Sequence, residues 1–377
     1  FTVYMGTWTN LTLYSKETVI GIRCSSSRPI NFWCFAMIKV IKDGVEVKGW
    51  KSVSVRLSLS TVCDGFNLSQ FVADDFSSPV LFPGDAVRIE VDDELLVDGY
   101  VDSMQSSFSS SDHSIDVSGR EKTCDLVDCA IEEFGKSWKN KTVSQIVGEV
   151  CQDFGLVFAA NGLPDNGQIA KFVPDPGCTG FDVIQDVCHQ KCVVCTSDGD
   201  GTVRFINESK FEYAEDFLRQ GVNVVSASVS YDNSERFSDC IVLCSSDPKT
   251  KRNGKSSDGE IKRKRCLVLV DEGYGTVETA GKRASFEVLS RSAKSTTLSV
   301  TLSGWKRNNG KLWRPGLLVD CLIPAFFGDF VETLLLNSVE LSYDSSGSVA
   351  VLELVRKDYY TQPPEHKGKV KSKADPW

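Results

Sequence analysis

Histidine is scarce in this sequence, and with it the commonest catalytic acid and base. Only His113, His189 and His366 occur among the 377 residues. His113 lies in a serine-rich segment that is typical of a turn, and no nucleophile-elbow sequence accompanies it. The acidic pairs at 92–93 and 132–133 fall in an expected turn and on an expected exposed helix, whereas glycoside hydrolysis needs two carboxylates facing each other across a cleft. The sequence therefore predicts a protein that is not an enzyme and has no cofactor.

Long apolar runs, a secretory signal and a basic overall charge are also missing. The longest apolar stretch, residues 30–41, is too short to cross a bilayer and is interrupted by Asn31 and Lys39. No basic segment followed by an apolar stretch and a cleavage site opens the chain. The 51 acidic residues outnumber the 42 basic ones, and this argues against nucleic acid as the main ligand, because phosphate binding needs a basic surface. We expect a soluble protein without membrane insertion.

Cysteine is abundant, but its spacing is that of neither a disulfide-rich nor a zinc protein. The 14 cysteines are predicted to be reduced thiols that behave as small core hydrophobes. Cys188, Cys192 and Cys195 resemble a metal-binding spacing, yet no second CxxC accompanies them. We expect these thiols to pack against Phe181 and Ile184 on the apolar side of a helix, and we expect no metal.

The apolar pattern changes twice along the chain. Short alternating segments, separated by glycine, aspartate and serine, predict antiparallel sandwiches or barrels on both sides of a middle region. The middle region carries two helical patterns, at 143–151 after the cap Thr142 and at 181–188, followed by a hairpin with Asp200-Gly201 at its turn. The predicted fold is mainly β with an α+β middle region, in which two similar antiparallel β-barrels flank a helix-containing domain.

These changes predict five segments. Regular alternation begins abruptly at Met37, after an apolar and Ser/Thr-rich stretch without a clear period that is either an upstream extension or an edge strand or arm of the domain. The expected segments are an N-terminal extension or arm at 1–36, a first β-barrel domain at 37–120, an α+β middle domain at 121–220, a second β-barrel domain at 221–360, and a flexible basic tail at 361–377.

The two β regions resemble each other in the same order along the chain. Residues 58–69 match 288–299 through Leu59, Ser60, Leu68 and Ser69 over Leu289, Ser290, Leu298 and Ser299; residues 83–87 (PGDAV) match 315–319 (PGLLV); and residues 101–117 match 336–351 with one insertion. Three matches in order favour a duplicated barrel over coincidence. Such a chain doubles the apparent symmetry of a cyclic oligomer.

A hairpin with two tryptophans is expected within residues 301–324. Asn309-Gly310 between extended segments favours a tight turn whose two central residues accept positive φ. Proline cannot donate to a sheet, so Pro315-Gly316 is expected to open a strand. Three cations surround the turn. The candidate interface or barrel-junction residues are Trp305, Lys306, Arg307, Lys311, Trp313, Pro315, Gly316, Pro83 and Gly84.

Basic residues are concentrated at 249–266, in KTKRNGKSSDGEIKRKRC. No aromatic residues are interleaved with these lysines and arginines, and glycine and serine interrupt them. A nucleic-acid contact is one interpretation. The favoured one is a solvated loop at the tip of a flexible hairpin.

Two stretches of the chain are specific enough to compare with known families, SGREKTCDLVDC at 118–129 and GWKRNNGKLWRPG at 304–316. They resemble the baseplate hub proteins of Mu-like contractile-tailed phages, and the resemblance covers about residues 37–360. This family is related to the phage late-control D proteins and to the hub part of type VI secretion spike proteins. Residues 1–36, the many cysteines and the basic segment fall outside the resemblance.

The resemblance implies a structural protein of the virion tail baseplate, assembled in the host cytoplasm. Its two barrels per subunit would form a homotrimeric, pseudo-six-fold ring that joins the six-fold tail tube to the three-fold membrane-piercing spike and encloses the DNA exit channel. The expected partners are further copies of the chain, the tail tube protein, the central spike protein and the tape-measure protein, with only weak, non-specific contact with DNA in transit. The alternatives are the hub of a type VI-like secretion or bacteriocin particle, and a carbohydrate-binding tail adhesin.

Two roles remain open for the tryptophan hairpin. The cationic tip could contact a neighbouring subunit or the tube protein, because tryptophan and arginine are favoured interface anchors. Alternatively, Trp305 and Trp313 close the end of the second barrel.

Overall fold

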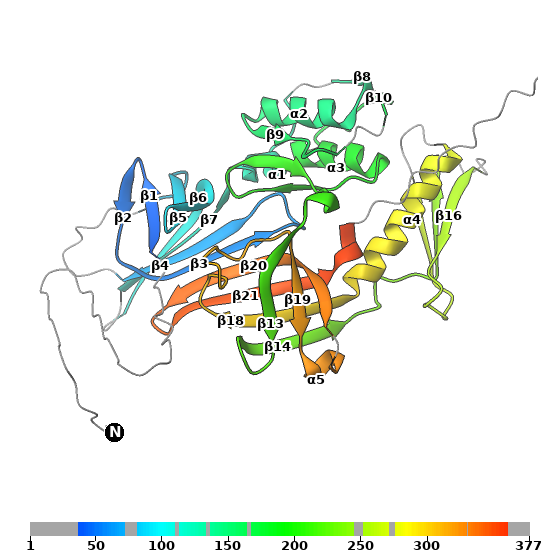
Figure 1. Ribbon diagram of the computed structural model, residues 1–377. Coiled ribbons are helices and arrows are strands. Elements are labelled where there is room, and N and C mark those ends of the chain that lie inside the picture. Colours follow the sequence, from blue (N-terminus) through cyan, green and yellow to red (C-terminus); the bar gives the residue numbers. More distant parts are fainter. Residues whose placement is uncertain are drawn as a thin grey trace, which may run out of the picture. The chain divides into compact units, whose positions relative to one another are not determined.

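The structure is a computed structural model that describes residues 37–71, 81–109, 113–132, 136–163, 167–244, 252–270, 276–329 and 331–360. The expected extension at 1–36 and the expected tail at 361–377 lie outside the described residues. Strands predominate over helices in the described parts (Figure 1), so the prediction of a mainly β protein with helices in its middle region is confirmed. No helix in these parts is long and apolar enough to cross a membrane.

Seven strands form the first part of the described chain. They are β1 (Ile38–Lys42), β2 (Val45–Val47), β3 (Trp50–Ser58), β4 (Gly65–Phe71), β5 (Ala86–Val91), β6 (Glu94–Phe108) and β7 (His113–Glu121). A turn at Asp43-Gly44 joins β1 to β2, and both residues have positive φ. Alternation places Val53 and Val55 of β3 in the core, while Ser54 between them is half-buried. These strands therefore bury one face, as their sequence pattern predicts.

The middle part combines helices with short strands. Its elements are α1 (Cys124–Asp128), β8 (Trp138–Lys141), α2 (Val143–Asp153), β9 (Val157–Ala159), β10 (Ile169–Phe172), α3 (Gly180–Gln190), β11 (Cys195–Ser197) and β12 (Thr202–Phe205). Thr142 and Thr179 begin α2 and α3 with capping boxes, in which the threonine hydroxyl accepts from the third helical amide. Both predicted helices and the β11–β12 hairpin are confirmed.

The last part contains a second set of strands and an insertion. The strands are β13 (Glu212–Arg219), β14 (Val224–Tyr231), β18 (Thr296–Ser303), β19 (Leu317–Leu322), β20 (Glu332–Asp344) and β21 (Gly347–Arg356), with the short helices η1 (Glu208–Lys210), α5 (Pro324–Phe327) and η2 (Lys357–Tyr360). The insertion between β14 and β18 holds β15 (Asp239–Leu243), β16 (Asn253–Ser257), β17 (Cys266–Val270) and α4 (Val277–Lys294). The sequence analysis expected strands alone here and missed α4.

Both strand sets belong to one sheet. Its order is β14-β18-β21-β20-β3-β4-β7-β6-β5-β1-β2, and β19 pairs with β20 and with β13. Figure 1 shows β18, β21, β20 and β3 side by side. The sets meet where Ser338–Tyr343 of β20 pair with Val53–Ser58 of β3. We call this ladder the internal joint. No closed barrel is found among the described residues. Strand β3 pairs with β20 of the other set, and not with a further strand of the first set.

Five strands of each set are connected alike. The order β3-β4-β7-β6-β5 in the first set corresponds to β14-β18-β21-β20-β19 in the second, and all these pairs are antiparallel. The ladder register shifts between Val101 and Ser103 on β6 and between Leu336 and Ser338 on β20. The ladder register also shifts between Trp50 and Ser52 on β3 and between Val224 and Ser226 on β14. A bulge fixes register, so these coincidences give a residue-by-residue correspondence.

The Pro-Gly turns follow the same correspondence. The Gly84 amide donates to the Val101 carbonyl at 2.8 Å, and the Gly316 amide donates to the Leu336 carbonyl at 2.9 Å. Both glycines have φ above +90°, a conformation that glycine adopts without strain. The predicted match of residues 83–87 with 315–319 thus agrees with the ladders.

The predicted match of 58–69 with 288–299 is wrong. Leu289 lies in α4, whereas Leu59 follows β3. The ladders also make Val300, and not Leu298, the counterpart of Leu68. The match of 101–117 with 336–351 starts in register and ends one residue out, because the insertion that it assumes is absent: Met104 pairs with Val117 and Val339 pairs with Leu352, at equal separations. Serine-rich composition produced the false part of the alignment.

Candidate functional site

The two tryptophans of the expected hairpin are both buried. We call residues 304–316 the junction loop. Trp305 is 2% exposed, and its indole Nε1 donates to the carbonyls of Ser342 at 2.9 Å and Val349 at 3.0 Å. Trp313 is 1% exposed, and its amide donates to the Trp305 carbonyl at 3.1 Å. Both indoles therefore belong to the main core of the sheet, and neither reaches the surface of this chain.

The turn of the junction loop differs in type from the expected one. The Gly310 amide donates to the Arg307 carbonyl at 2.9 Å, and Lys306 forms a bridge with Leu312. Between Arg307 and Lys311 only Gly310 has positive φ, while Asn309 does not. A three-residue hairpin loop needs left-handed backbone only at its last residue, unlike the two-residue loop that Asn-Gly suggested.

The cations of the loop have different surroundings. Lys306 lies 2.5 Å from Asp92, in the β5–β6 turn of the first set. Arg307 donates through Nη1 to the Ala214 carbonyl of β13 at 2.8 Å, whereas Lys311 is exposed. Partial burial acts to raise the pKa of Asp92, but its hydrogen bonds with Lys306 and the Met37 amide hold that pKa below its ordinary value. Lys306 and Arg307 thus make contacts within the chain.

Arg314 is a contact residue that the sequence analysis missed. Its Nε donates to Glu94 at 2.6 Å, and its Nη2 donates to the Leu95 carbonyl, both on β6. With Lys306, it gives the junction loop two ionic contacts to the first strand set. In the sequence, only the position of Arg314 between Trp313 and a proline distinguishes this arginine. Neighbouring residues give no information about a partner 220 residues away. Solvent-accessible ion pairs contribute little stability individually, so their main effect is on orientation.

The Pro-Gly residues do not gather at one place. Pro83 and Gly84 are exposed and precede β5, whereas Pro315 and Gly316 are half-buried and precede β19. They occupy corresponding positions of the two sets. The candidate residues therefore form one junction loop and one distant, equivalent turn.

A second contact joins the middle part to the first strand set through buried carboxylates. Glu121, at the end of β7, is fully buried and accepts from the Ser197 hydroxyl at 2.5 Å and from the Gly201 amide at 2.9 Å. It also accepts from the amide of Asp64, whose own carboxylate accepts from the Ser58 amide at 2.9 Å. These bonds hold the β11–β12 hairpin against the ends of β3 and β7.

Burial changes the acidity of this pair. Burial raises the pKa of Asp64, and the nearby Glu121 charge raises it further. Burial also raises the pKa of Glu121, although its hydrogen bonds with Ser197 and Gly201 act in the opposite direction. The sequence analysis missed both residues, because single acidic residues near strand ends carry no distinguishing pattern.

Cys188, Cys192 and Cys195 are all buried, but only two of them show the expected packing. Cys188 and Cys195 lie in one apolar cluster with Ile184, and Phe181 packs against that cluster. Their Sγ atoms are 3.5 Å apart. Cys192 is buried but lies outside this cluster. In the described chain no three histidine, cysteine or acidic side chains are grouped as metal ligands.

His113 begins a strand and does not lie in a turn. It is the first residue of β7, and its Nε2 lies 3.2 Å from the Ser106 hydroxyl of β6. The expected location was wrong, because His113 is already part of the β6–β7 ladder and pairs with Phe108.

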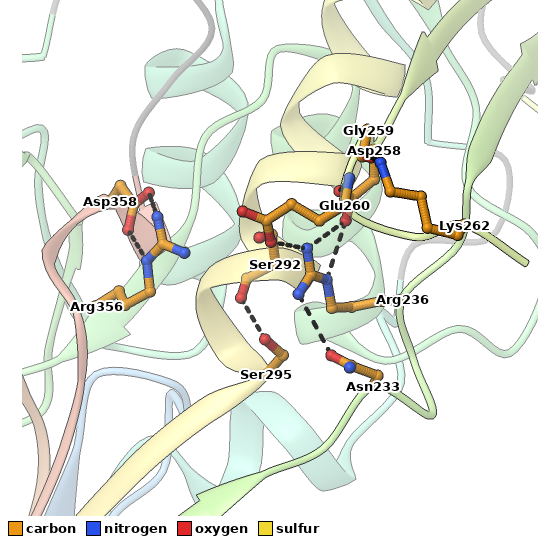
Figure 2. Close-up of polar contacts among 10 residues, drawn as sticks. All are labelled: Asn233, Arg236, Asp258, Gly259, Glu260, Lys262, Ser292, Ser295, Arg356 and Asp358. Atoms are coloured by element: carbon orange, nitrogen blue, oxygen red, sulfur yellow. Dashed lines mark hydrogen bonds and ion pairs between the residues drawn. The ribbon is translucent and has the colours of Figure 1, made fainter. Parts of the chain in front are cut away.

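The basic segment is more ordered than the predicted flexible hairpin tip. Residues 253–257 form β16, and both β16 and β17 pair with β15 instead of with each other. Arg236 is buried beside this segment and donates to Asp258 and Glu260 at 2.7 Å each, as Figure 2 shows. The Arg265 guanidinium stacks 5.0 Å from the ring centre of Phe237. Arg236 thus binds the two acidic residues of the segment, and the Phe237 ring contacts one of its arginines.

Three family models match successive parts of the chain. They are described as Mu phage baseplate assembly protein GpP-like, N-terminal, over residues 37–121; baseplate hub protein gp44-like, second domain, over residues 123–207; and Mu phage baseplate assembly protein GpP, fourth domain, over residues 276–363. The chain is also 27% identical over 347 residues to the baseplate hub protein gp44 of Escherichia phage Mu, a match that covers 88% of this chain and 91% of that protein.

Solved structures agree with these matches. The 43 kDa tail protein of prophage MuSo2 from Shewanella oneidensis has a TM-score of 0.77 and 29% identity, covering 86% of this chain and 99% of that one. A tail protein from Neisseria meningitidis MC58 shares the fold with a TM-score of 0.75 and 19% identity, covering 87% of this chain and 100% of that one. The chain belongs to the baseplate hub proteins of Mu-like phage tails.

Proposed function

We propose that this hub protein assembles as a homotrimeric ring that adapts the six-fold tail tube to the three-fold central spike. The observation that carries the proposal is the repeated strand order, in which β3-β4-β7-β6-β5 corresponds to β14-β18-β21-β20-β19. Three chains with two equivalent strand sets offer six similar positions to the tube. The parts that differ between the sets provide three unique positions to the spike.

The junction loop supports this role by fixing the two sets within one chain. A ring closes only if the angle between successive strand sets is constant. Without the junction loop, the β20–β3 ladder of the internal joint alone would hold this angle. Lys306 with Asp92 and Arg314 with Glu94 add contacts between the sets outside that ladder. Exposed Lys311 stays available as a contact to a tube subunit.

The charge of the protein fits a channel through which DNA passes. A net charge of −9 disfavours tight phosphate binding, so DNA in transit would make only weak, non-specific contacts. We propose that the tail tube protein, the central spike protein and the tape-measure protein are the partners, and that assembly takes place in the host cytoplasm.

The mass of the purified protein in solution, measured over a range of concentrations, tests the ring. A concentration-dependent trimer whose end-on images in negative stain show six similar lobes is expected. A dimer or a hexamer at every concentration contradicts the proposal, because neither gives six strand sets from three chains.

A further inference from the structure

Strand β17 lies at one edge of a small sheet and has no partner on its outer side among the described residues. The insertion between β14 and β18 forms this sheet, whose strand order is β16-β15-β17. Strand β15 pairs antiparallel with β16 and parallel with β17. We call the unpaired side of β17 the open edge. The first strand set has no counterpart of it, because residues 59–64 connect β3 directly to β4.

Helix α4 covers β15 and β16 on one side of this sheet. Val242 of β15 is fully buried in one apolar cluster with Ala280 and Ala284 of α4. The helix lies directly on β16, where a Cβ on Gly254 would come within 2.0 Å of the Gly281 amide nitrogen. Figure 1 shows α4 beside β16. The helix therefore protects the β16 side of the sheet.

Strand β17 stays partly exposed on both faces. Leu267 and Leu269 pack against the cluster under α4 but are only half-buried. On the opposite face Val268 is 53% exposed and Val270 is 37% exposed. Apolar surface left in water is costly, and a strand that exposes it on both faces is typical of an interaction site. The core of the insertion is thus incomplete at β17.

The open edge lacks the features that keep strand edges apart. Strand β17 reads CLVLV, without charge or proline, and its ladder with β15 has no bulge. Natural sheets usually protect an exposed edge with one of these features, because unpaired amides and carbonyls recruit other strands. The opposite edge differs, since β16 carries the exposed Lys255. The open edge is therefore suited to accept a strand from another chain.

The ladder with β15 shows which main-chain groups are available at the open edge. The Arg265 carbonyl accepts from the Asp239 amide of β15 at 3.0 Å. Main-chain groups of alternate residues point to the same side of a strand. Those of Leu267 therefore also point toward β15, whereas the amides of Val268 and Val270 point to the open edge.

Positive charge is concentrated where β17 begins. In the turn before this strand, Asp258 and Glu260 both bind Arg236, at 2.7 Å each (Figure 2). Arg263 and Lys264 follow this turn, are exposed, and make no hydrogen bond or ion pair with a described residue. The buried arginine thus takes up the acidic residues of the turn. The positive charge next to β17 is left for a partner of opposite charge.

We propose that the open edge binds an extended apolar segment of another tail component as an added antiparallel strand, with acidic residues after the apolar run. Main-chain hydrogen bonds to Val268 and Val270 would supply affinity, and the antiparallel direction is the more stable one. It places the acidic end of the segment beside Arg263 and Lys264, which fix its orientation. Each chain binds one such segment, whatever the state of the ring.

Synthetic peptides and the full-length protein test this contact by fluorescence anisotropy. The probe is a labelled peptide of alternating valine and threonine with three glutamates at its C-terminal end, and the control peptide carries three lysines there. Val268→Pro removes an open-edge amide and leaves the β15 ladder intact, because proline is tolerated where an edge amide faces solvent. Val268→Thr is the matched control that keeps the amide.

The acidic peptide should bind the unaltered protein and Val268→Thr equally, and Val268→Pro about tenfold more weakly. Arg263→Glu with Lys264→Glu should weaken it about two- to fivefold and favour the lysine peptide. Equal binding to the unaltered protein and a folded Val268→Pro variant overturns the strand pairing. Equal binding of the two peptides by the unaltered protein overturns the role of the cations, and no binding at the solubility limit overturns both.

Hydrogen exchange of the unaltered protein locates the bound peptide without any substitution. The Val268 amide should exchange quickly in the free protein and become protected by the acidic peptide, whereas the Leu267 amide should be protected in both states. Peptide binding without protection of Val268 contradicts the proposal. A second copy of this chain is the alternative occupant, through a two-fold contact between two open edges. A smaller assembly mass for Val268→Pro than for the unaltered protein would indicate that occupant and overturn the proposal; an unchanged mass is expected.

Discussion

Replacing Trp305 by phenylalanine should weaken the second strand set more than the same change at Trp313. The two tryptophans are equally buried, at 2% and 1% exposure, but only the Trp305 indole donates to the carbonyls of Ser342 and Val349 among the described residues. Loss of the second ring costs about 1–2 kcal/mol of apolar burial at either site. Loss of the donor adds about 1 kcal/mol at Trp305 alone. We therefore expect about 2–3 kcal/mol for Trp305→Phe and about 1–2 kcal/mol for Trp313→Phe.

Urea unfolding, followed by far-ultraviolet circular dichroism and by fluorescence, measures both losses. Coincident transitions are required before a free energy is taken from the curve, because the chain has several parts. Unchanged m-values would show that the unfolded state is not altered. Equal losses at the two sites would refute the role given to the Trp305 hydrogen bonds, and a loss below about 0.5 kcal/mol at both would refute the buried placement of the loop.

Four further outcomes are expected. Asp64 and Glu121 have raised pKa values in the folded state, so the stability that they contribute is complete below the ordinary carboxyl pKa of about 4 and is lost as the pH rises through their folded pKa values. Asp64→Asn should therefore reduce the change of the urea midpoint between pH 4 and pH 8. A pH dependence of the midpoint equal to that of the unaltered protein would contradict this. Gly199→Ala should destabilise the protein by more than about 2 kcal/mol in the same assay, because the new Cβ would lie 2.1 Å from the Leu96 carbonyl oxygen and φ is +81°; a neutral change would show that the hairpin can shift. Elemental analysis after chelator-free purification should find no stoichiometric zinc or iron. A chain that begins at Met37 should fold and assemble like the full chain, and aggregation would show that the first segment is structural.

Local signals predicted the parts of the fold that depend on local chemistry. The capping threonine Thr142 and the spacing of apolar residues after it located α2, and Asp200-Gly201 located the β11–β12 hairpin. Both depend on residues within one or two turns of chain. The helix α4 was missed because alanines form most of its buried side, at Ala280, Ala284 and Ala293, and alanine gives a weak hydrophobic pattern.

Long-range pairing was beyond local reasoning. The repeat correctly indicated two similar strand sets, yet it implied two closed barrels, whereas β3 pairs with β20 and opens both sets into one sheet. A strand pattern fixes which side is buried but leaves the neighbour undetermined. For the same reason the sequence gave no sign of Asp92 or Ala214 as the partners of Lys306 and Arg307, which flank the turn instead of forming it.

The central claim is that one chain supplies two equivalent positions of a six-fold ring. A cryo-electron microscopy reconstruction of the tail tip, calculated without imposed symmetry, tests it most directly. The expected result is a layer of three chains in which β3-β4-β7-β6-β5 and β14-β18-β21-β20-β19 alternate around the axis, related by successive rotations of about 60°. A layer built from six chains, or one in which the second strand set lies away from the ring, would contradict it.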